Sequence, residues 1–405
     1  MNIVVQKFGG SSLSSPELRE VAASRVADAA RSGAHVVVVV SAIGRAPEPY
    51  ATDTLLSLIG PVRGGPNRDL LLAVGEMISA AVFAELLNSL GWHAQAMTGG
   101  QAGILTDGAF GDARILHVDP HAVRAALDAG IIPVVTGFQG ATEAGAVSTL
   151  GRGGSDLTAI ALGDALGATS VDIYTDVSGV MTADPRRVAG AHTVERVTPA
   201  EMVELAGNGA KVMHSKAAEL AHSTNTPYAV KGLRSNVGTL IDEDAPVDRE
   251  RPVTGITALR GVAFFRVIQG LSDEGGRATL DRELFDRLAA ATISIDMINV
   301  NDAGVFFVCD DENVERVQGE LHNLNLALRV RMHCAKLSIV GAGMRGTPGV
   351  MAAVVRAVTE AGVEIIHSTD SNITISVLVP DDGAGRAEQA LHDYFALGPH
   401  ATAAV

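Results

Sequence analysis

The stretch GRGGSD at residues 151–156 places a cation, two glycines and an anion within six residues. Arg152 can form a bidentate ion pair with a carboxylate, and Asp156 can accept hydrogen bonds from an ammonium group. The glycines leave backbone N–H groups open to a ligand, and we expect Ser155 to cap the following helix. The pattern predicts a site for a zwitterion. The alternative is an Arg152–Asp156 pair that only braces the loop.

A lysine and two glycines follow the first apolar run, in VVQKFGGSSL at residues 4–13. Backbone N–H groups in such a turn, close to a helix start, favour phosphate oxygens. Lys7 adds a positive charge, so Lys7, Gly9 and Gly10 form a candidate phosphate site. The alternative is that the glycines serve only the tight turn.

Two further polar positions border apolar segments. The segment VVVVVSAIG at residues 36–44 ends a buried strand in Ser41 and Gly44, at the edge where open α/β sheets bind ligands. The alternative is that Ser41 is only a polar strand terminus. Glu76 follows Gly75 at what we expect to be the start of an apolar helix. There it would either complement the helix dipole or face a ligand amine.

Two later segments combine charges with exposed backbone. The segment YTDVSGVMTADPRRV at residues 174–188 carries Asp176, Asp184 and Arg186, and GNGAKVMHSK at residues 207–216 carries Lys211. The first could hold a nucleotide and the second could supply another phosphate contact. Solvated surface charges are the alternative for both.

The elements that must position these residues form an α/β pattern. Uninterrupted apolar runs predict strands covered on both faces, and therefore a mainly parallel sheet between helices. Ser15 and Pro16 predict a capped helix start, and the helix after them has one apolar face. The runs lie at residues 3–5, 35–42, 131–138 and 170–176, and the apolar face comprises Leu18, Val21, Ala22, Val26 and Ala29.

A charged, proline-containing segment at residues 242–252 has no periodicity and predicts a linker. Beyond it the chain repeats at an offset of 70 residues, with residues 290–308 over 360–378. Each copy reads helix, strand, turn, strand, helix after an initial strand, which is a βαββαβ unit. We expect a first domain at residues 1–245 and two modules at residues 253–330 and 331–405.

Composition limits the class of protein. A chain of 405 residues predicts two or three domains. Its formal net charge of −15 argues against a nucleic-acid partner. Cys309 and Cys334 lack metal-ligand spacing and are expected to be buried thiols in a reducing compartment. The first residues read as a strand rather than a signal peptide, and the run at 36–43 is too short to cross a membrane. We expect a cytoplasmic, soluble protein without a membrane partner.

Together these stretches resemble the aspartate kinases of the amino-acid kinase family over essentially the whole chain. The resemblance implies a three-layer αβα kinase domain followed by two ACT domains of ferredoxin-like fold that sense an amino acid. It implies transfer of the ATP γ-phosphate to the β-carboxylate of L-aspartate, with ATP and Mg²⁺ and without a resident metal site. The carrying motifs are KFGGSS, SAIG, VGE, GFQGAT, GRGGSD, TDVSGVMTADPR, MVELAGNGAKV and VGAGMRGTPGV.

The resemblance also assigns roles by matching position. It implies that Lys7, Asp156 and Lys211 act in catalysis. The implied aspartate pocket comprises Ser41, Thr52, Glu76, Arg152, Ser155 and Asp156. The implied ATP site comprises Lys7, Gly9, Gly10, Thr175, Asp176, Asp184, Arg186, Lys211 and Val212.

The chain departs from the family pattern at Leu157, Met181, Ser215, Lys216 and Lys231. None of these changes removes a charge assigned above. The departures leave open whether the enzyme serves general or specialised metabolism.

Asp370 and Asn372 are expected in a turn of the second module, where the family binds regulatory amino acids. An extra carboxylate there favours lysine or diaminopimelate as effector, although turns favour Asp and Asn in any case. Unpaired sheet edges predict at least a homodimer. The alternatives to an aspartate kinase are a relative acting on another carboxylate, a phosphate or a carbamate, and an amino-acid-binding regulator without turnover.

Overall fold

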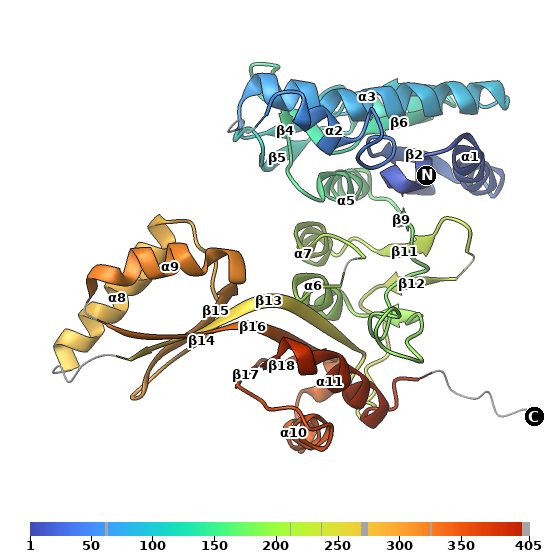
Figure 1. Cartoon of the computed structure of the whole chain (residues 1–405). Coiled ribbons are helices and arrows are strands. Elements are labelled where there is room, and N and C mark those ends of the chain that lie inside the picture. Colours follow the sequence, from blue (N-terminus) through green and yellow to red (C-terminus); the bar gives the residue numbers. More distant parts are fainter. Residues whose placement is uncertain (61–63, 211, 236, 269–273, 325, 399–405) are drawn as a thin grey trace, which may run out of the picture. The chain divides into compact units, whose positions relative to one another are not determined.

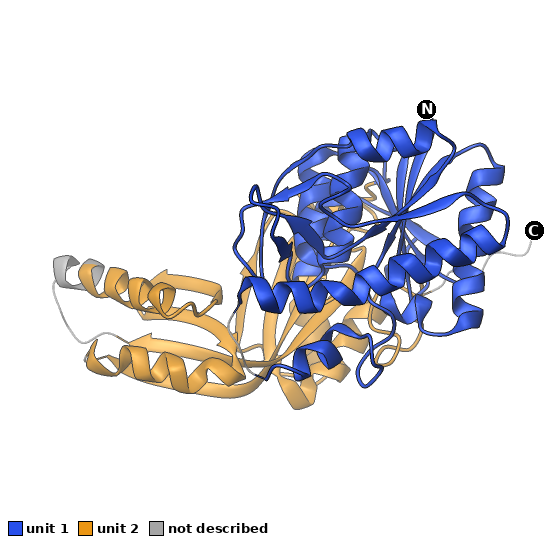
Figure 2. Ribbon diagram, turned by 90° about the horizontal axis from the view of Figure 1, so that it is seen from above, with its two compact units in different colours: residues 1–180, 193–207, 211–246 blue, residues 181–192, 208–210, 247–405 orange. Residues whose placement is uncertain are grey.

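The structure is a computed structural model that describes residues 1–60, 64–210, 212–235, 237–268, 274–324 and 326–398. Its internal contacts divide the chain into two compact units, coloured separately in Figure 2. Unit 1 comprises residues 1–180, 193–207 and 211–246. Unit 2 comprises residues 181–192, 208–210 and 247–405.

An eight-stranded sheet with the strand order β10-β12-β11-β9-β1-β2-β6-β3 forms the centre of unit 1. The run of neighbours from β11 to β3 is parallel throughout, which confirms the predicted mainly parallel sheet. The strands are β1 (Ile3–Phe8), β2 (His35–Val40), β3 (Ala94–Met97), β6 (Ile132–Thr136), β9 (Ser170–Thr175), β10 (Arg196–Val197), β11 (Tyr228–Gly232) and β12 (Gly238–Ile241).

Helices cover this sheet, and a second, four-stranded sheet completes unit 1 (Figure 1). The helices are α1 (Pro16–Arg31), α2 (Thr52–Ser57), α3 (Pro66–Ser89), α4 (His121–Asp128), α5 (Gly154–Leu166), α6 (Pro199–Gly207) and α7 (Ser215–Thr224). The second sheet has the order β5-β4-β7-β8 and consists of β4 (Ile104–Thr106), β5 (Ile115–Val118), β7 (Gln139–Ala141) and β8 (Val147–Thr149).

Helix α1 forms as its sequence predicts. The Ser15 hydroxyl accepts a hydrogen bond from the Leu18 N–H at 3.3 Å, and Pro16 occupies the first helical position. Ala22 and Val26 are fully buried in the main core of the unit, with Leu18 packed against them. A single apolar face and a capped start therefore fix this helix on the sheet.

Helix α3 corrects one expectation. It begins at Pro66, so Gly75 and Glu76 lie in its middle and not at its start. The helix is long and apolar enough, by length and composition, to cross a membrane, and half of its most apolar window is buried inside the protein. Phe83 and Leu87 pack in the main core, which identifies α3 as a core helix. The helix is apolar because many of its side chains pack inside the protein.

Unit 2 contains a six-stranded antiparallel sheet with the order β14-β15-β13-β16-β18-β17. In Figure 1, α8 and α9 lie beside one end of this sheet and α10 and α11 beside the other. The elements are β13 (Gly255–Ile268), α8 (Glu274–Ala290), β14 (Asp296–Asn301), β15 (Gly304–Asp310), α9 (Val314–Leu321), β16 (Ala327–Val340), α10 (Val350–Glu360), β17 (His367–Asp370), β18 (Thr374–Pro380) and α11 (Asp381–Tyr394).

The elements of unit 2 repeat with the offset seen in the sequence. Helices α8 and α10 end at Ala290 and Glu360, and β15 and β18 begin at Gly304 and Thr374. Each half has its own hydrophobic core. Strands β13 and β16 run through both halves, so Ile256 packs in the core of the second half although it precedes the first. Cys309 and Cys334 are buried free thiols, as expected.

Candidate active site

The loops after three parallel strands meet at one edge of the large sheet. The Gly9 N–H donates to the Tyr174 carbonyl of β9 at 3.3 Å, and the Gly44 N–H donates to the Gly10 carbonyl at 3.0 Å. A Cβ atom on Gly10 would lie 2.4 Å from the Ala42 carbonyl oxygen, so only glycine allows this approach. The carboxyl ends of β1, β2 and β9 therefore form one surface of backbone groups, at the edge where open α/β sheets bind ligands.

A buried ion pair lies at this edge. Lys7 Nζ in β1 is 2.7 Å from Asp156 Oδ1 in α5, and the side chains are 11% and 12% exposed. Removing two charges from water is costly unless they pair, so each residue fixes the other. Sequence reasoning placed Lys7 with phosphate and Asp156 with the substrate amine, but the structure brings the two together.

The glycine loop before α5 differs from expectation in two respects. The helix begins at Gly154 after Gly153, whose φ is 75°, and no side chain caps it, so the prediction that Ser155 caps the helix is wrong. Ser155 lies in the first turn and is buried. The predicted alternative of an Arg152–Asp156 brace is also wrong, because Asp156 pairs with Lys7. Arg152 is exposed.

Glu76 is nearly fully buried, with 2% of the residue exposed. Its Oε1 accepts a hydrogen bond from the Ala42 N–H at 3.0 Å, and no described residue donates to Oε2. Burial raises the pKa of Glu76 to about 8, against a smaller lowering by the Ala42 N–H. Because the residue lies in mid-helix, the helix-dipole alternative is wrong. The ligand-amine interpretation stays a prediction.

Ser41 and Thr52 border the same loop. Ser41 follows β2, and its N–H donates to the Phe8 carbonyl of β1 at 3.1 Å. Thr52 is the first residue of α2. Both are partly exposed. A Cβ on Gly75 of α3 would lie 2.8 Å from the Tyr50 carbonyl oxygen, so a glycine lets this helix approach the loop between β2 and α2.

The end of β9 carries two of the predicted nucleotide residues. Thr175 Oγ1 donates to Asp176 Oδ1 at 3.1 Å, and Asp176 Oδ2 accepts from Arg45 at 3.0 Å. The Asp176 and Arg45 side chains are 51% and 73% exposed. An exposed pair of this kind is weak, so both charges are available to a ligand.

The remaining predicted nucleotide residues are divided. Asp184 and Arg186 belong to unit 2 and pair with each other, with Arg186 donating to both carboxylate oxygens at 2.9 and 2.7 Å. Val212 is partly buried in unit 1. Lys211 lies outside the described residues.

The predicted effector residues occupy the expected turn. Asp370 ends β17, and Asn372 follows it before β18, with both exposed. Unit 2 also has a pocket of about 380 Å³, lined by Phe264, Arg266, Phe306, Arg329, Val330, Arg331, Glu364, Ile366 and His367. Neither Asp370 nor Asn372 lines it, so the turn and the pocket are separate features.

Sequence reasoning missed several residues of the site. The ring of His214 packs where a Cβ on Gly153 would lie, and the buried Tyr228 has its pKa raised by burial and by the charge of Asp156. Lys231, one of the departures from the family pattern, pairs with Asp172 at 2.8 Å. His214 and Tyr228 are distant from the glycine motifs in the sequence, and no local pattern marks them as part of the site.

Comparison with known proteins places this arrangement in a family. The family model described as "Amino acid kinase family" matches residues 2–232, and an ACT domain model matches residues 329–393. Aspartokinase 1 of Bacillus subtilis is 40% identical over 98% of this chain and all of its own length. The aspartokinase of Corynebacterium glutamicum is 42% identical over 98% of this chain and 97% of its own. The chain belongs to the amino acid kinase family and, within it, to the aspartokinases.

Solved aspartokinase structures share the fold over nearly the whole chain. E. coli aspartokinase III in complex with aspartate and ADP, described as the R-state, has a TM-score of 0.77 at 25% identity and covers 97% of this chain and 99% of its own. The same enzyme with lysine and aspartate, described as the T-state, has a TM-score of 0.76 at 25% identity, with the same coverage. The aspartokinase family therefore accounts for both units.

Proposed function

We propose that this chain is an ATP-dependent aspartate kinase producing 4-phospho-L-aspartate and ADP, the first step toward lysine, threonine, methionine and diaminopimelate. The observation that carries the proposal is the buried Lys7–Asp156 pair, beside the glycine turn at the carboxyl edge of the parallel sheet. In the reaction, a β-carboxylate oxygen of aspartate attacks the γ-phosphorus of ATP. The bond from that phosphorus to the β,γ-bridging oxygen breaks, and ADP leaves with the electron pair.

The nucleophile needs no general base, because a carboxylate with an ordinary pKa of about 3.9 is ionised at neutral pH. What the reaction requires is cancellation of the repulsion between two anions. Lys7 supplies a positive charge at the edge of the sheet, and Asp156 holds its ammonium group in place. We assign catalysis to Lys7 and Asp156, with Lys211 as a second cation.

Aspartate recognition requires partners for one ammonium group and two carboxylates. Glu76 Oε2 is buried and has no hydrogen-bond partner among the described residues, and a substrate ammonium group would satisfy it and favour the ionised form of this carboxyl group. Arg152 presents a free guanidinium to a carboxylate. We include Ser41, Thr52, Ser155 and Asp156 in the same pocket.

ATP would occupy the backbone surface between the loops after β1 and β9. The proposed contacts are Gly9 and Gly10 with phosphate, and Thr175, Asp176, Asp184, Arg186 and Val212 with the rest of the nucleotide. No group of three or more His, Cys, Asp or Glu side chains suited to a metal occurs among the described residues. Mg²⁺ would be held through substrate phosphates with one or two carboxylates, and when bound it would neutralise phosphate charge.

We propose that unit 2 comprises ACT modules at residues 253–330 and 331–405, the second completed by residues near Ile256, and that residues 1–245 form the kinase domain. An end-product amino acid, lysine or diaminopimelate, would bind near Asp370 and Asn372. A complex of E. coli aspartokinase III with lysine supports this class of effector. We place the protein in the cytoplasm.

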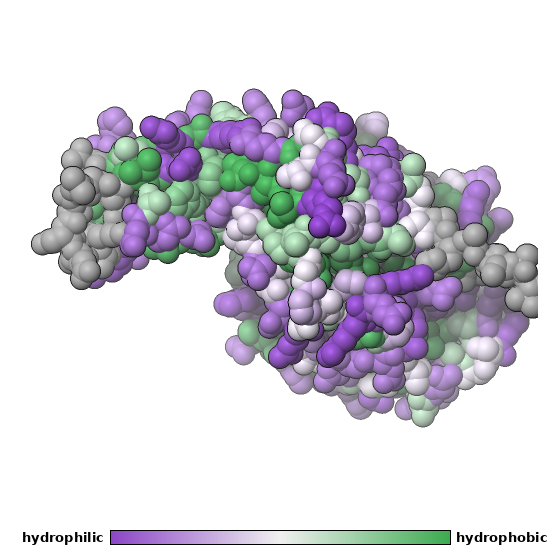
Figure 3. Space-filling view, turned by 90° about the horizontal axis from the view of Figure 1, so that it is seen from below, coloured by the Kyte–Doolittle hydropathy of each residue, from purple (hydrophilic) through white to green (hydrophobic). Residues whose placement is uncertain are grey.

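A second copy of the chain is the proposed partner of unit 2. Phe264 alternates with residues that face the core of the first half and packs in a separate buried cluster with Met297 and Phe306. The edge strand β14 of the same sheet leaves Ile298 and Val300 47% and 50% exposed. Figure 3 shows hydrophobic and hydrophilic residues side by side on the surface of unit 2. Exposed apolar side chains on a sheet are commonly buried against a second subunit, so we expect a homodimer or a higher homo-oligomer.

One assay tests the proposed reaction. Hydroxylamine traps an acyl phosphate as a hydroxamate, and a coupled assay follows ADP release with L-aspartate and Mg-ATP. We expect both signals to depend on aspartate. ATP binding in calorimetry without any hydroxamate at saturating aspartate would instead identify a regulator that does not turn over.

A further inference from the structure

The segment of residues 181–192 is built into unit 2, although it follows a strand of unit 1 in the sequence. Its backbone is fixed at one end, where the Ile256 N–H of β13 donates to the Thr182 carbonyl at 2.8 Å. Ala183 and Val188 are buried. The segment is therefore a packed part of the regulatory unit.

Helix α11 supplies the polar contacts that hold this segment. Thr182 Oγ1 and His392 Nε2 form a buried hydrogen bond of 3.0 Å. Gln389 bonds both backbone groups of Ala189: its Oε1 accepts from the N–H at 2.8 Å, and its Nε2 donates to the carbonyl at 3.3 Å. These contacts clamp the segment near both ends, since Thr182 and Ala189 are seven residues apart.

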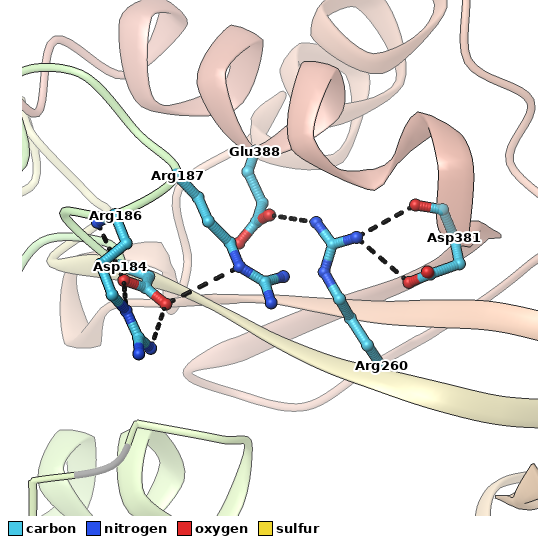
Figure 4. A network of polar contacts seen from close by, with 6 residues as sticks. All are labelled: Asp184, Arg186, Arg187, Arg260, Asp381 and Glu388. Carbon is cyan, nitrogen blue, oxygen red and sulfur yellow. Dashed lines mark hydrogen bonds and ion pairs between the residues drawn. The ribbon is translucent and has the colours of Figure 1, made fainter.

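Figure 4 shows charged residues of this segment together with Arg260 and two acidic residues of α11. Asp184 accepts from Arg186 and lies 3.8 Å from Arg187 Nε. On the other side Arg260 links Glu388 of α11, at 3.0 Å, to Asp381 at the start of the same helix, at 3.2 Å. Glu388 and Gln389 each neighbour His392 on the surface of α11, because residues four and three positions apart lie close together on a helix.

We propose that α11 positions the nucleotide-binding segment, and that Gln389 and His392 are positioning residues for ATP, acting through Ala189 and Thr182. The inference rests on the proposed function, which places Asp184 and Arg186 against the nucleotide. Helix α11 packs in the core of the second half of unit 2, where Ala387 and Leu391 contact β16 and β18. A change in that half would thus reach the segment that carries Asp184 and Arg186 through two hydrogen-bonded clamps.

The test uses the full chain and removes each clamp separately. Gln389→Ala loses both bonds to Ala189. Thr182→Val loses, at nearly constant volume, the bond to His392 and the bond that Thr182 Oγ1 accepts from the His192 N–H at 3.2 Å. Each should raise the KM for ATP about 3- to 10-fold with kcat and the aspartate KM unchanged, because the lost hydrogen bonds are of ordinary strength and act on binding alone. Thr182→Ser keeps the hydroxyl and should retain the original KM.

Arg386→Ala is the matched control, since Arg386 is an exposed residue of the same helix. Hydrogen exchange of residues 181–192 should accelerate in Gln389→Ala and Thr182→Val but not in this control. Unchanged exchange and unchanged ATP KM in both variants would overturn the clamp. Faster exchange with unchanged ATP KM would overturn the positioning role by showing that the segment does not serve ATP. The hydroxamate assay on the unmodified protein is done first. If it gives no aspartate-dependent hydroxamate, the proposed reaction fails, and this outcome is distinct from a failure of the clamp.

Discussion

Each unit contains a buried helical glutamate, and the two differ in their partners. Glu76 in unit 1 is 2% exposed and Glu388 in unit 2 is 1% exposed. Burial raises the pKa of both. Glu388 is held by Arg260 at 3.0 Å, whereas Glu76 has one backbone donor and an Oε2 atom without a described donor. Equal burial thus accompanies a satisfied structural ion pair in one unit and an open acceptor in the other.

The same contrast extends beyond these two residues. In unit 1, polar groups gather at the end of a parallel sheet and leave Arg152 and Asp176 accessible. In unit 2, the charged groups around Arg260 mostly pair with each other (Figure 4). An unsatisfied buried polar group is costly. Such atoms occur in both units, Glu76 Oε2 in unit 1 and Arg260 Nε in unit 2, so it is the accessible Arg152 and Asp176 that favour a ligand site in unit 1. Variants of the two regions should therefore differ in kind: loss of catalysis or substrate binding at the sheet edge of unit 1, and loss of regulation at the turn of Asp370 and Asn372 in unit 2.

The largest effect is expected from Lys7→Ala. The variant removes the cation beside the glycine turn, and kcat should fall about 10³-fold or more, as for other cations that stabilise phosphoryl transfer. It also leaves Asp156 as an unpaired buried charge, which costs on the order of 3–5 kcal/mol of stability. Steady-state kinetics and thermal unfolding measure the two effects.

Arg114→Ala is the control for this variant, because Arg114 forms an exposed ion pair with Asp107 in the same unit. It should leave kcat and stability nearly unchanged. A folded Lys7→Ala enzyme with the original kcat would show that the buried pair is only structural.

The residues that could be predicted from the sequence are those in local patterns. The strands, α1, the linker and the repeat follow from periodicity and capping, and the glycine motifs locate the site. The sequence predicts a helix start at Glu76, whereas α3 begins ten residues earlier at Pro66. Its N-cap residue, Gly65, makes no side-chain hydrogen bond, so no capping signal in the sequence marks the true start. The Lys7–Asp156 pair joins residues far apart in the sequence, so only the packing of α5 against β1 reveals it.

A pH effect is expected from Glu76→Gln. In the folded protein the pKa of about 8 exceeds the ordinary value of 4.5. Below pH 4.5 the residue is therefore protonated in both the folded and the unfolded state and does not reduce the stability of the fold. As the pH rises from 4.5 to 8 the unfolded state releases the proton and the folded state keeps it, so stability falls, by a total on the order of 5 kcal/mol. Glutamine lacks this titration and keeps an acceptor for the Ala42 N–H.

Urea unfolding at pH 5, 6.5 and 8 measures this effect. The stability advantage of Glu76→Gln over the original chain should increase with pH and level off above pH 8. Glu85→Gln, an exposed residue of the same helix, should show no such trend. A pH-independent difference for Glu76→Gln would contradict the raised pKa.

A smaller and purely kinetic effect is expected from Arg152→Ala. Loss of a charge-assisted bidentate contact costs about 2–4 kcal/mol, which corresponds to a rise of about 30- to 1000-fold in the KM for aspartate. The exposed arginine supports no other described structure, so melting temperature should not change. If the aspartate KM of the folded variant matched that of the original enzyme, the GRGGSD loop would have no role in substrate binding.

The smallest effect is expected in the regulatory unit, from joint replacement of Asp370 and Asn372 by alanine. An effector inhibits only through different affinities for two arrangements of the modules, and a coupling of about 1–3 kcal/mol changes the rate or the aspartate KM severalfold. Because both side chains are exposed in a turn, their loss should leave uninhibited activity near the original value while relieving inhibition by lysine or diaminopimelate. Dose–response curves for lysine, threonine, methionine and diaminopimelate, singly and in pairs, measure this. Inhibition of the double variant at the original effector concentration would move the effector site away from this turn, and no inhibition of the original enzyme by any of the four would mean that unit 2 serves assembly alone.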